Sequence, residues 1–176
     1  ILIGIVLGYI VKWMVNWLAI DNFIMSRKNF FLEAVGAIMV TWSAVNLGIE
    51  EAIIFSIIAL TLAGISVIDF HTFEIPLIFI IIGVVASVAG IFLKVILLSS
   101  AFWGIFVGAL IPMAIMLIMW GITKRQGMGY GDIQLGIVLG AWLGPMRMAL
   151  TLFGASLLSL LAWLGVSLFK GFDKDR

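Results

Sequence analysis

The 176-residue chain contains no cysteine and a single histidine, and these absences exclude several kinds of site. Without cysteine there is no disulfide, no thiolate metal ligand and no thiol nucleophile. A zinc protease of the His-Glu-x-x-His type needs two histidines, so we expect no metal site of that kind. Charged residues make up only 11% of the chain and the formal net charge is +1, which argues against a nucleic-acid partner.

Apolar residues, in contrast, make up 64% of the chain, and the mean hydropathy is +1.30. This is more apolar surface than a soluble core of this length can enclose. A membrane-spanning helix needs about 20 mostly apolar residues. We therefore predict an all-α fold, a polytopic transmembrane helix bundle of about seven spans. The apolar runs place these helices at residues 1–20, 32–48, 52–69, 75–93, 96–122, 133–148 and 149–169.

The whole chain, residues 1–176, is expected to form a single transmembrane domain. Because it begins at Ile1 within an apolar run, we expect it to be truncated at one or both ends. Glycines at a spacing of four residues predict close contact between helices. These are Gly4 and Gly8, Gly104 and Gly108, and the series Gly136, Gly140 and Gly144.

The connections between the apolar runs divide the positive charge unequally between the two sides of the membrane. If the first span runs inward, one side collects Arg27, Lys28, Lys124, Arg125, Lys170, Lys174 and Arg176, and the other collects Lys94 and Arg147. The more basic side is expected to be cytoplasmic. The chain is therefore predicted to be a multi-pass protein of the cell (inner) membrane.

Asp69 and Asp132 are the most informative acidic residues, because an ionisable side chain at the edge of a span is costly to bury. Asp69 follows the uncharged run 52–68, and Asp132 follows three glycines within residues 127–131. Asp132 taken alone is equally well explained as a helix N-cap. Lys12 lies within the first span and is expected to extend its ammonium group to the interface.

The predicted topology places Asp69 and Asp132 at the cytoplasmic ends of their helices. Two carboxylates close together in a partly dry cleft share a proton. The ionised member takes a proton from an attacking water, and the protonated member polarises a peptide carbonyl. A serine protease motif is absent, since Gly64-Ile-Ser66 is followed by valine. The Glu50–Glu51 pair lacks a nearby arginine and falls on the outer side, so an aspartyl dyad is the remaining protease chemistry.

These residues resemble the GxGD intramembrane aspartyl proteases, specifically the type IV prepilin peptidases and the preflagellin peptidases. Gly129-Tyr-Gly-Asp132 matches the motif that names the group, and Asp69 followed by Ile75-Pro76 matches its partner motif. Phe31-Leu-Glu33 is similar to the start of the family's second helix. The similarity covers residues 31–165 and is to the bacterial branch. Residues 21–30 are too few, and lack the cysteines, for the zinc domain that many members carry.

The resemblance implies a membrane aspartyl endopeptidase that removes a short basic leader at the cytoplasmic face, with Asp69 and Asp132 as catalytic residues. Its partners would be prepilin, pseudopilin or preflagellin-type precursors within the lipid bilayer, and no oligomeric state is predicted. The peptidase reaction implies no cofactor. S-adenosylmethionine is expected only if the chain also methylates the new N-terminus, an activity of many bacterial members.

Four further residues are expected to bind substrate. Gly129 and Gly131 permit the close approach of another backbone. Glu33 and Glu74 are acidic residues expected near the cytoplasmic surface, where they would attract a basic leader.

Two other functions remain open at this stage. In a proton-coupled carrier, Asp69 and Asp132 would be relay sites, although charges at mid-span and inverted repeats are not evident in the sequence. A noncatalytic scaffold of a pilus or secretion system would tolerate the loss of either aspartate.

Overall fold

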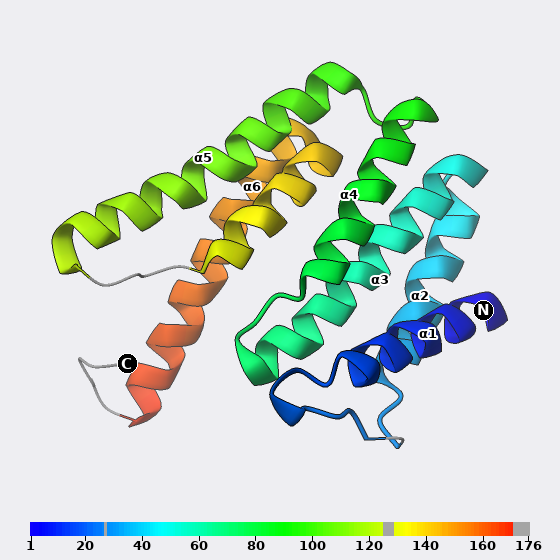
Figure 1. Ribbon diagram of the computed structural model, residues 1–176, viewed down its shortest axis with the longest axis horizontal. Helices are drawn as coiled ribbons and strands as arrows, with labels where there is room; N and C mark the ends of the chain where they lie inside the picture. The colour runs from blue at the N-terminus through cyan, green and yellow to red at the C-terminus, as the bar shows by residue number, and fades with distance from the viewer. Residues whose placement is uncertain (27, 125–128, 171–176) are drawn as a thin grey trace.

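The computed structural model describes residues 1–26, 28–124 and 129–170, and over these ranges it contains helices and short connections without a strand (Figure 1). The all-α prediction is confirmed. The elements in order are α1 (Leu2–Leu18), the 3₁₀ helix η1 (Ile20–Asn22), α2 (Phe31–Asn46), α3 (Ile49–Thr72), α4 (Leu77–Phe92), α5 (Leu98–Thr123) and α6 (Tyr130–Lys170). Several residues used in the sequence argument lie outside the described ranges, namely Arg27, Arg125, Gly127, Lys174 and Arg176.

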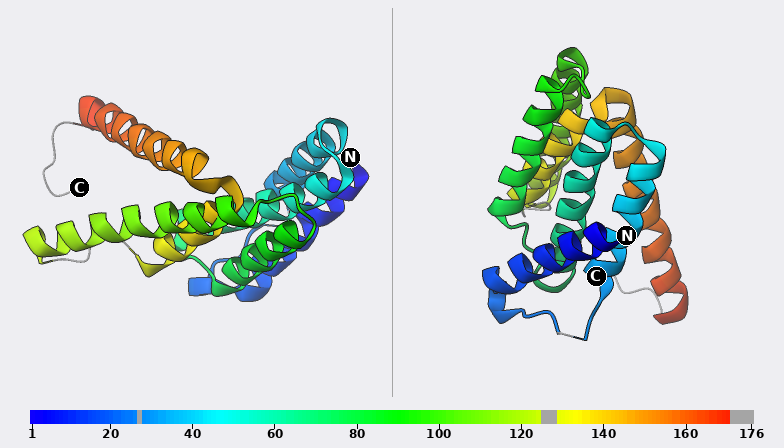
Figure 2. Two further views of the ribbon diagram at one scale, coloured as in Figure 1. Left: turned by 90° about the horizontal axis from the view of Figure 1, so that it is seen from above. Right: turned by 90° about the vertical axis from the view of Figure 1, so that its right-hand side faces the viewer.

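α6 contains two arms, because its backbone is not helical at Gly144, where φ is 75° and ψ is 174°. Pro145 follows, and a proline disfavours the helical conformation at the residue before it, while glycine adopts a positive φ at little cost. Figures 1 and 2 show the two arms diverging from this point. The predicted count of about seven spans is therefore approximate: the described residues form six α-helices, and the break in α6 falls at residue 144, a few residues before the predicted boundary between 148 and 149.

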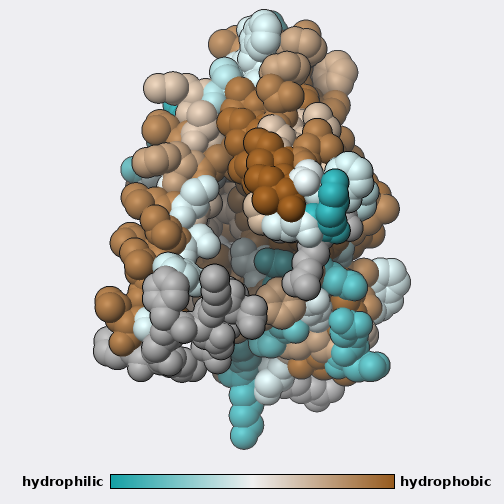
Figure 3. Space-filling model, turned by 90° about the vertical axis from the view of Figure 1, so that its left-hand side faces the viewer, coloured by the Kyte–Doolittle hydropathy of each residue, from teal (hydrophilic) through white to brown (hydrophobic). Residues whose placement is uncertain are grey.

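The helices fit a membrane protein. By length and apolar composition, α3, α5 and α6 are each long enough to cross a bilayer. α1, α2 and α4 are apolar but shorter, at 17, 16 and 16 residues. At about 1.5 Å per residue such helices are roughly 24–26 Å long, a little less than the hydrocarbon thickness. Figure 3 shows one face of the molecule that is largely hydrophobic, with hydrophilic residues gathered toward its lower part.

α3 lies at the centre of the first four helices. α1, α2 and α4 all pack against it, and the core between them includes Leu32, Ile68 and Phe79, each at most 1% exposed. α5 packs along α6, and α4 also contacts α6. The contact between α4 and α6 therefore joins the first four helices to the last two.

Glycines allow two pairs of helices to touch through their backbones. A Cβ atom on Gly8 of α1 would lie 2.2 Å from the carbonyl oxygen of Leu32 in α2. On α5, a Cβ atom on Gly104 would lie 1.9 Å from the carbonyl oxygen of Gly140 in α6. Side chains at these positions would push the helices apart. The glycine spacing in the sequence therefore marks real helix contacts.

Replacement of Gly140 by alanine should destabilise the fold, although alanine favours a helix more than glycine does. The added methyl group would lie 2.1 Å from the carbonyl oxygen of Gly104, so α5 and α6 would have to separate. We expect Gly140→Ala to lose about 2 kcal/mol or more of unfolding free energy, as overpacked sites do. Thermal unfolding in a mild detergent measures this change.

Gly154→Ala is the matched control, because Gly154 is on the same helix and a Cβ atom added to it would have no neighbouring atom within 4 Å. This variant should be neutral or slightly stabilised. Equal melting temperatures for the two variants would show that α5 and α6 do not make this contact.

Candidate active site

Asp69 and Asp132 line one cavity of about 570 Å³. The cavity lies between the last turn of α3, the connection that leads into α4, and the first turn of α6. Its other lining residues are Phe73, Glu74, Ile75, Gly129, Tyr130, Gly131 and Gln134. The sequence predicted four site residues besides the two aspartates, and three of them, Glu74, Gly129 and Gly131, are in this cavity.

The end of α3 directs the chain from Asp69 toward α6. Phe73 adopts the left-handed conformation, with φ 57° and ψ 27°, and its backbone N–H donates a hydrogen bond of 2.9 Å to the carbonyl of Asp69. This closes the helix in the manner of a left-handed C-cap. Pro76 then precedes the first residue of α4, where its fixed φ suits the start of a helix. The intervening Glu74 and Ile75 lie beside the cavity.

Gly131 is required by the packing of this connection against α6. A Cβ atom on Gly131 would lie 3.0 Å from the Cβ atom of Ile75. A side chain at position 131 would therefore require Ile75 to move by a few tenths of an ångström. Further along α6, Val138 packs on Gly83 of α4. A Cβ atom on Gly83 would lie 2.6 Å from a methyl group of Val138. These two contacts set the position of Asp132 relative to Asp69.

Asp132 also caps the helix that carries it. The backbone N–H of Gly129 donates a 3.2 Å hydrogen bond to Oδ2 of Asp132, and the N–H of Asp132 donates one of 3.2 Å to the Gly129 carbonyl. The first of these bonds corresponds to one half of a capping box, in which an acidic side chain in the first turn accepts from the N–H group before the helix. Asp132 is therefore not the N-cap considered from the sequence, since α6 begins at Tyr130, but its side chain still binds a free N–H group at the start of the helix while it lines the cavity.

The cavity is negatively charged. Asp132 is half-buried and Asp69 is exposed, and both line the same cavity. Glu74 adds a third carboxyl group, and the described lining residues include no lysine, arginine or histidine. Such a cavity attracts a cationic ligand. Two adjacent carboxyl groups of this kind can also activate a water molecule.

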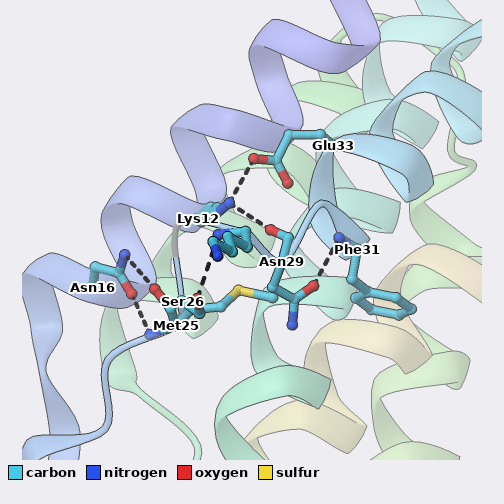
Figure 4. A network of polar contacts seen from close by, with 8 residues as sticks. Lys12, Asn16, Met25, Ser26, Asn29, Phe31 and Glu33 are labelled. Atoms are coloured by element: carbon cyan, nitrogen blue, oxygen red, sulfur yellow. Dashed lines mark hydrogen bonds and ion pairs between the residues drawn. The ribbon is translucent and has the colours of Figure 1, made fainter.

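Glu33 is not in this cavity. Its side chain is buried and its Oε1 atom forms an ion pair of 2.9 Å with Nζ of Lys12, so Lys12 does not extend to the interface as expected (Figure 4). Lys12 also donates a hydrogen bond to the carbonyl of Asn29. The chain supplies both partners, which offset part of the cost of burying the lysine. The substrate role of Glu33 stays a prediction.

The sequence analysis did not identify the pair of Lys12 and Glu33. One signal was available, since the two residues are oppositely charged and lie on consecutive apolar helices, Lys12 within the first and Glu33 at the start of the second. A buried charge in a membrane helix normally has a partner, so the two charges could have been matched.

Part of the chain matches a known protein family. A family model described as the type IV leader peptidase family matches residues 53–164, which include Asp69 and Asp132 and exclude Lys12 and Glu33. No solved structure matches the chain significantly.

Several curated proteins are similar to this chain. The prepilin leader peptidase/N-methyltransferase of Dichelobacter nodosus is 33% identical over 90 residues, which are 51% of this chain and 30% of that protein. The protein of the same name from Stutzerimonas stutzeri is 35% identical over 75 residues, which are 43% of this chain and 25% of the relative. The chain therefore matches only about a quarter to a third of the length of these relatives.

Replacement of Asp132 by alanine should lower the stability of the protein, because the N–H of Gly129 loses its acceptor. The expected loss is about 1 kcal/mol, as for other helix caps. Thermal unfolding in detergent checks this value. Asp69→Ala is the control, since Asp69 is exposed, and it should change stability by less than about 0.5 kcal/mol. A larger loss for Asp69→Ala than for Asp132→Ala would contradict the capping assignment.

Proposed function

Because the chain belongs to the type IV leader peptidase family, we propose that it is a membrane aspartyl endopeptidase of the GxGD type, with Asp69 and Asp132 as its catalytic residues. The observation that carries this proposal is the cavity that the two aspartates share. The substrate would be a prepilin-like precursor, from which the enzyme removes a short leader. The curated relatives are named for this activity.

In the proposed reaction, one carboxylate takes a proton from a water molecule held between Asp69 and Asp132. The other carboxyl group, in its protonated form, donates a hydrogen bond to the carbonyl oxygen of the scissile peptide. Water attacks the carbonyl carbon, and the proton passes to the leaving amine. No covalent bond to the enzyme forms. The hydrogen bond from Gly129 holds Asp132 in place during these steps.

The substrate backbone would approach the cavity beside Gly129. Two atoms would lie within 4 Å of a Cβ atom on Gly129: Oδ2 of Asp132 at 3.5 Å and the nitrogen of Gly131 at 3.9 Å. Space for a substrate backbone therefore remains beside Gly129. The corresponding space at Gly131 is occupied by Ile75. We therefore assign Gly129 to substrate contact and Gly131 to packing. Glu74, which is exposed at the cavity, is suited to attract a basic residue of the leader.

The active site would face the cytoplasm, in the inner membrane. Lys28 and Lys124 support this orientation, because they lie at the ends of the helices where the cavity opens. Lys28 is in the connection between α1 and α2, whose residues pack beside the last turns of α3, and Lys124 is the C-cap of α5. A cytoplasmic excess of positive residues is the general rule for membrane proteins.

S-adenosylmethionine does not fit the cavity of Asp69 and Asp132. This methyl donor carries an amino-acid carboxylate that needs a cationic partner, but the cavity of Asp69 and Asp132 offers only carboxyl groups. Lys12, in a second pocket, is already bound by Glu33 and Asn29. Lys124 and Arg147 line two further pockets, neither of which contains Asp69 or Asp132. We therefore derive no methyl transfer, although the curated relatives are named N-methyltransferases as well.

Asp69→Asn and Asp132→Asn should each reduce cleavage of a pilin-type precursor by at least about 100-fold, because asparagine cannot exchange the proton. The measurement is the rate of leader removal by the purified full chain in detergent. Glu51→Gln is the control, since Glu51 is at the opposite end of α3, and it should cleave at the wild-type rate. Full activity in either aspartate variant would contradict the proposal, and the absence of cleavage by the purified wild-type chain would favour a noncatalytic scaffold.

Glu74→Gln should raise KM for a precursor with a basic leader by about three- to tenfold, with little change in kcat, because the charge acts before the chemical step. A precursor whose leader lysines and arginines are replaced by glutamine is the comparison substrate. Its KM should not respond to the substitution. An equal rise in KM for both precursors would show that Glu74 does not recognise the leader charge.

A further inference from the structure

A second pocket lies beside α1 and α2, outside the part of the chain that matches the peptidase family. It has a volume of about 500 Å³. Its lining residues are Tyr9, Lys12, Trp13, Asn16, Phe30 and Glu33. Figure 4 shows the polar residues of this region, with Lys12 and Asn16 extending from α1 toward Glu33 and the connection before α2. The peptidase reaction proposed above makes no use of this pocket.

The pocket is built around a buried ion pair. The side chains of Lys12 and Glu33 are 6% and 9% exposed, and their charged atoms are 2.9 Å apart. Nζ of Lys12 also lies 5.3 Å from the centre of the Phe30 ring. Removing two charges from water costs several kcal/mol per ion before their attraction is counted. Ionisable residues placed so deeply in a membrane protein generally have a function.

One atom of this ion pair still needs a hydrogen-bond donor. Oε1 of Glu33 is bound by Lys12, but Oε2 is buried without a partner among the residues that the structure describes. A buried carboxylate oxygen left in this state is unfavourable, so a ligand that donates to it gains binding energy. An ammonium group is the strongest such donor.

The aromatic residues favour the same kind of ligand. Tyr9, Trp13 and Phe30 surround the pocket, and the face of an aromatic ring attracts a cation. Tyr9 and Trp13 are 59% and 58% exposed, and Trp13 stacks on Trp17 near the end of α1, with ring centres 6.4 Å apart. Aromatic residues near the end of an apolar helix typically lie at the level of the lipid headgroups.

We propose that this pocket binds the primary ammonium group of an aminophospholipid, of which phosphatidylethanolamine is the simplest, with Oε2 of Glu33 as the acceptor. The lipid phosphate stays in the solvated interface, and the acyl chains lie along the exposed apolar face of α1. A zwitterionic headgroup adds no net charge to the neutral pair of Lys12 and Glu33. A lysine side chain of a leader would add a buried positive charge, and the cavity beside Asp69, with three carboxyl groups, is the better site for it.

The test is the thermal stability of the purified full chain in detergent, with short-chain phosphatidylethanolamine or phosphatidylcholine of the same acyl length added. Phosphatidylcholine is the matched probe, because its quaternary ammonium group has no N–H to donate to Glu33. Phosphatidylethanolamine should raise Tm by about 3 °C or more at saturating concentration, and phosphatidylcholine should raise it by less.

Two variants connect the effect to the pocket. Glu33→Gln should weaken phosphatidylethanolamine binding by about tenfold or more, because the acceptor loses its charge. Since Glu33→Gln leaves Lys12 without a charged partner, the double variant Lys12→Met/Glu33→Leu is a second test, and it should fold and lose the lipid effect. Asp21→Asn, which removes an exposed acid from the neighbouring connection, should keep the full effect.

Three results would overturn the proposal. Equal stabilisation by the two lipids would exclude recognition of the ammonium N–H groups, and no lipid effect at all would mean that water alone occupies the pocket. S-adenosylmethionine or a basic leader peptide could instead raise Tm in a way that depends on Glu33, while phosphatidylethanolamine does not. That result would assign the pocket to the ligand that raises Tm. None of these measurements uses precursor cleavage, so the lipid site and the peptidase activity can fail independently.

Discussion

The contact between α4 and the first arm of α6 joins the two groups of helices, and the position of the candidate active site depends on it. Val138 packs on Gly83, and Ile75, just before α4, packs on Gly131. Both contacts are possible because the glycine has no side chain. They bring the first turn of α6 to the last turn of α3, so that Asp132 and Asp69 line one cavity although 62 residues separate them in the sequence, from position 69 to position 132.

Several charged and polar groups of this apolar chain are placed where the chain supplies partners for them. Asp132 accepts a hydrogen bond from Gly129, and Glu33 forms an ion pair with Lys12. Asn16 accepts a hydrogen bond of 2.7 Å from the backbone N–H of Met25, which holds the connection between α1 and α2 against α1. In a medium without water each of these groups would otherwise be costly. The carboxyl group of Asp69 is exposed to the cavity instead, as a group that reacts with a substrate must be.

Much of the helical fold could be predicted from the sequence, because apolar runs and glycine spacing report directly on membrane helices and their contacts. The shared cavity of Asp69 and Asp132 was also expected, since the topology places both at the same ends of their helices. The break in α6 lies at Gly144, a few residues before the predicted boundary between 148 and 149, and Gly144-Pro145 is its signal in the sequence. The pairing of Lys12 with Glu33 depends on how α1 and α2 pack, and a single sequence does not specify which side chains meet across two apolar helices.

The central claim is that α3 and α6 bring residues 69 and 132 together, and the absence of cysteine allows a direct measurement of it. The double variant Asp69→Cys/Asp132→Cys would carry the only two thiols in the chain, and a short bifunctional thiol reagent can be added to membranes that contain it. We predict an efficient intramolecular cross-link, seen as a shift in gel mobility. The pair Glu51→Cys/Asp132→Cys, with one residue at the far end of α3, should not react in this way. Cross-linking of the 69–132 pair no greater than that of the control pair would contradict the account.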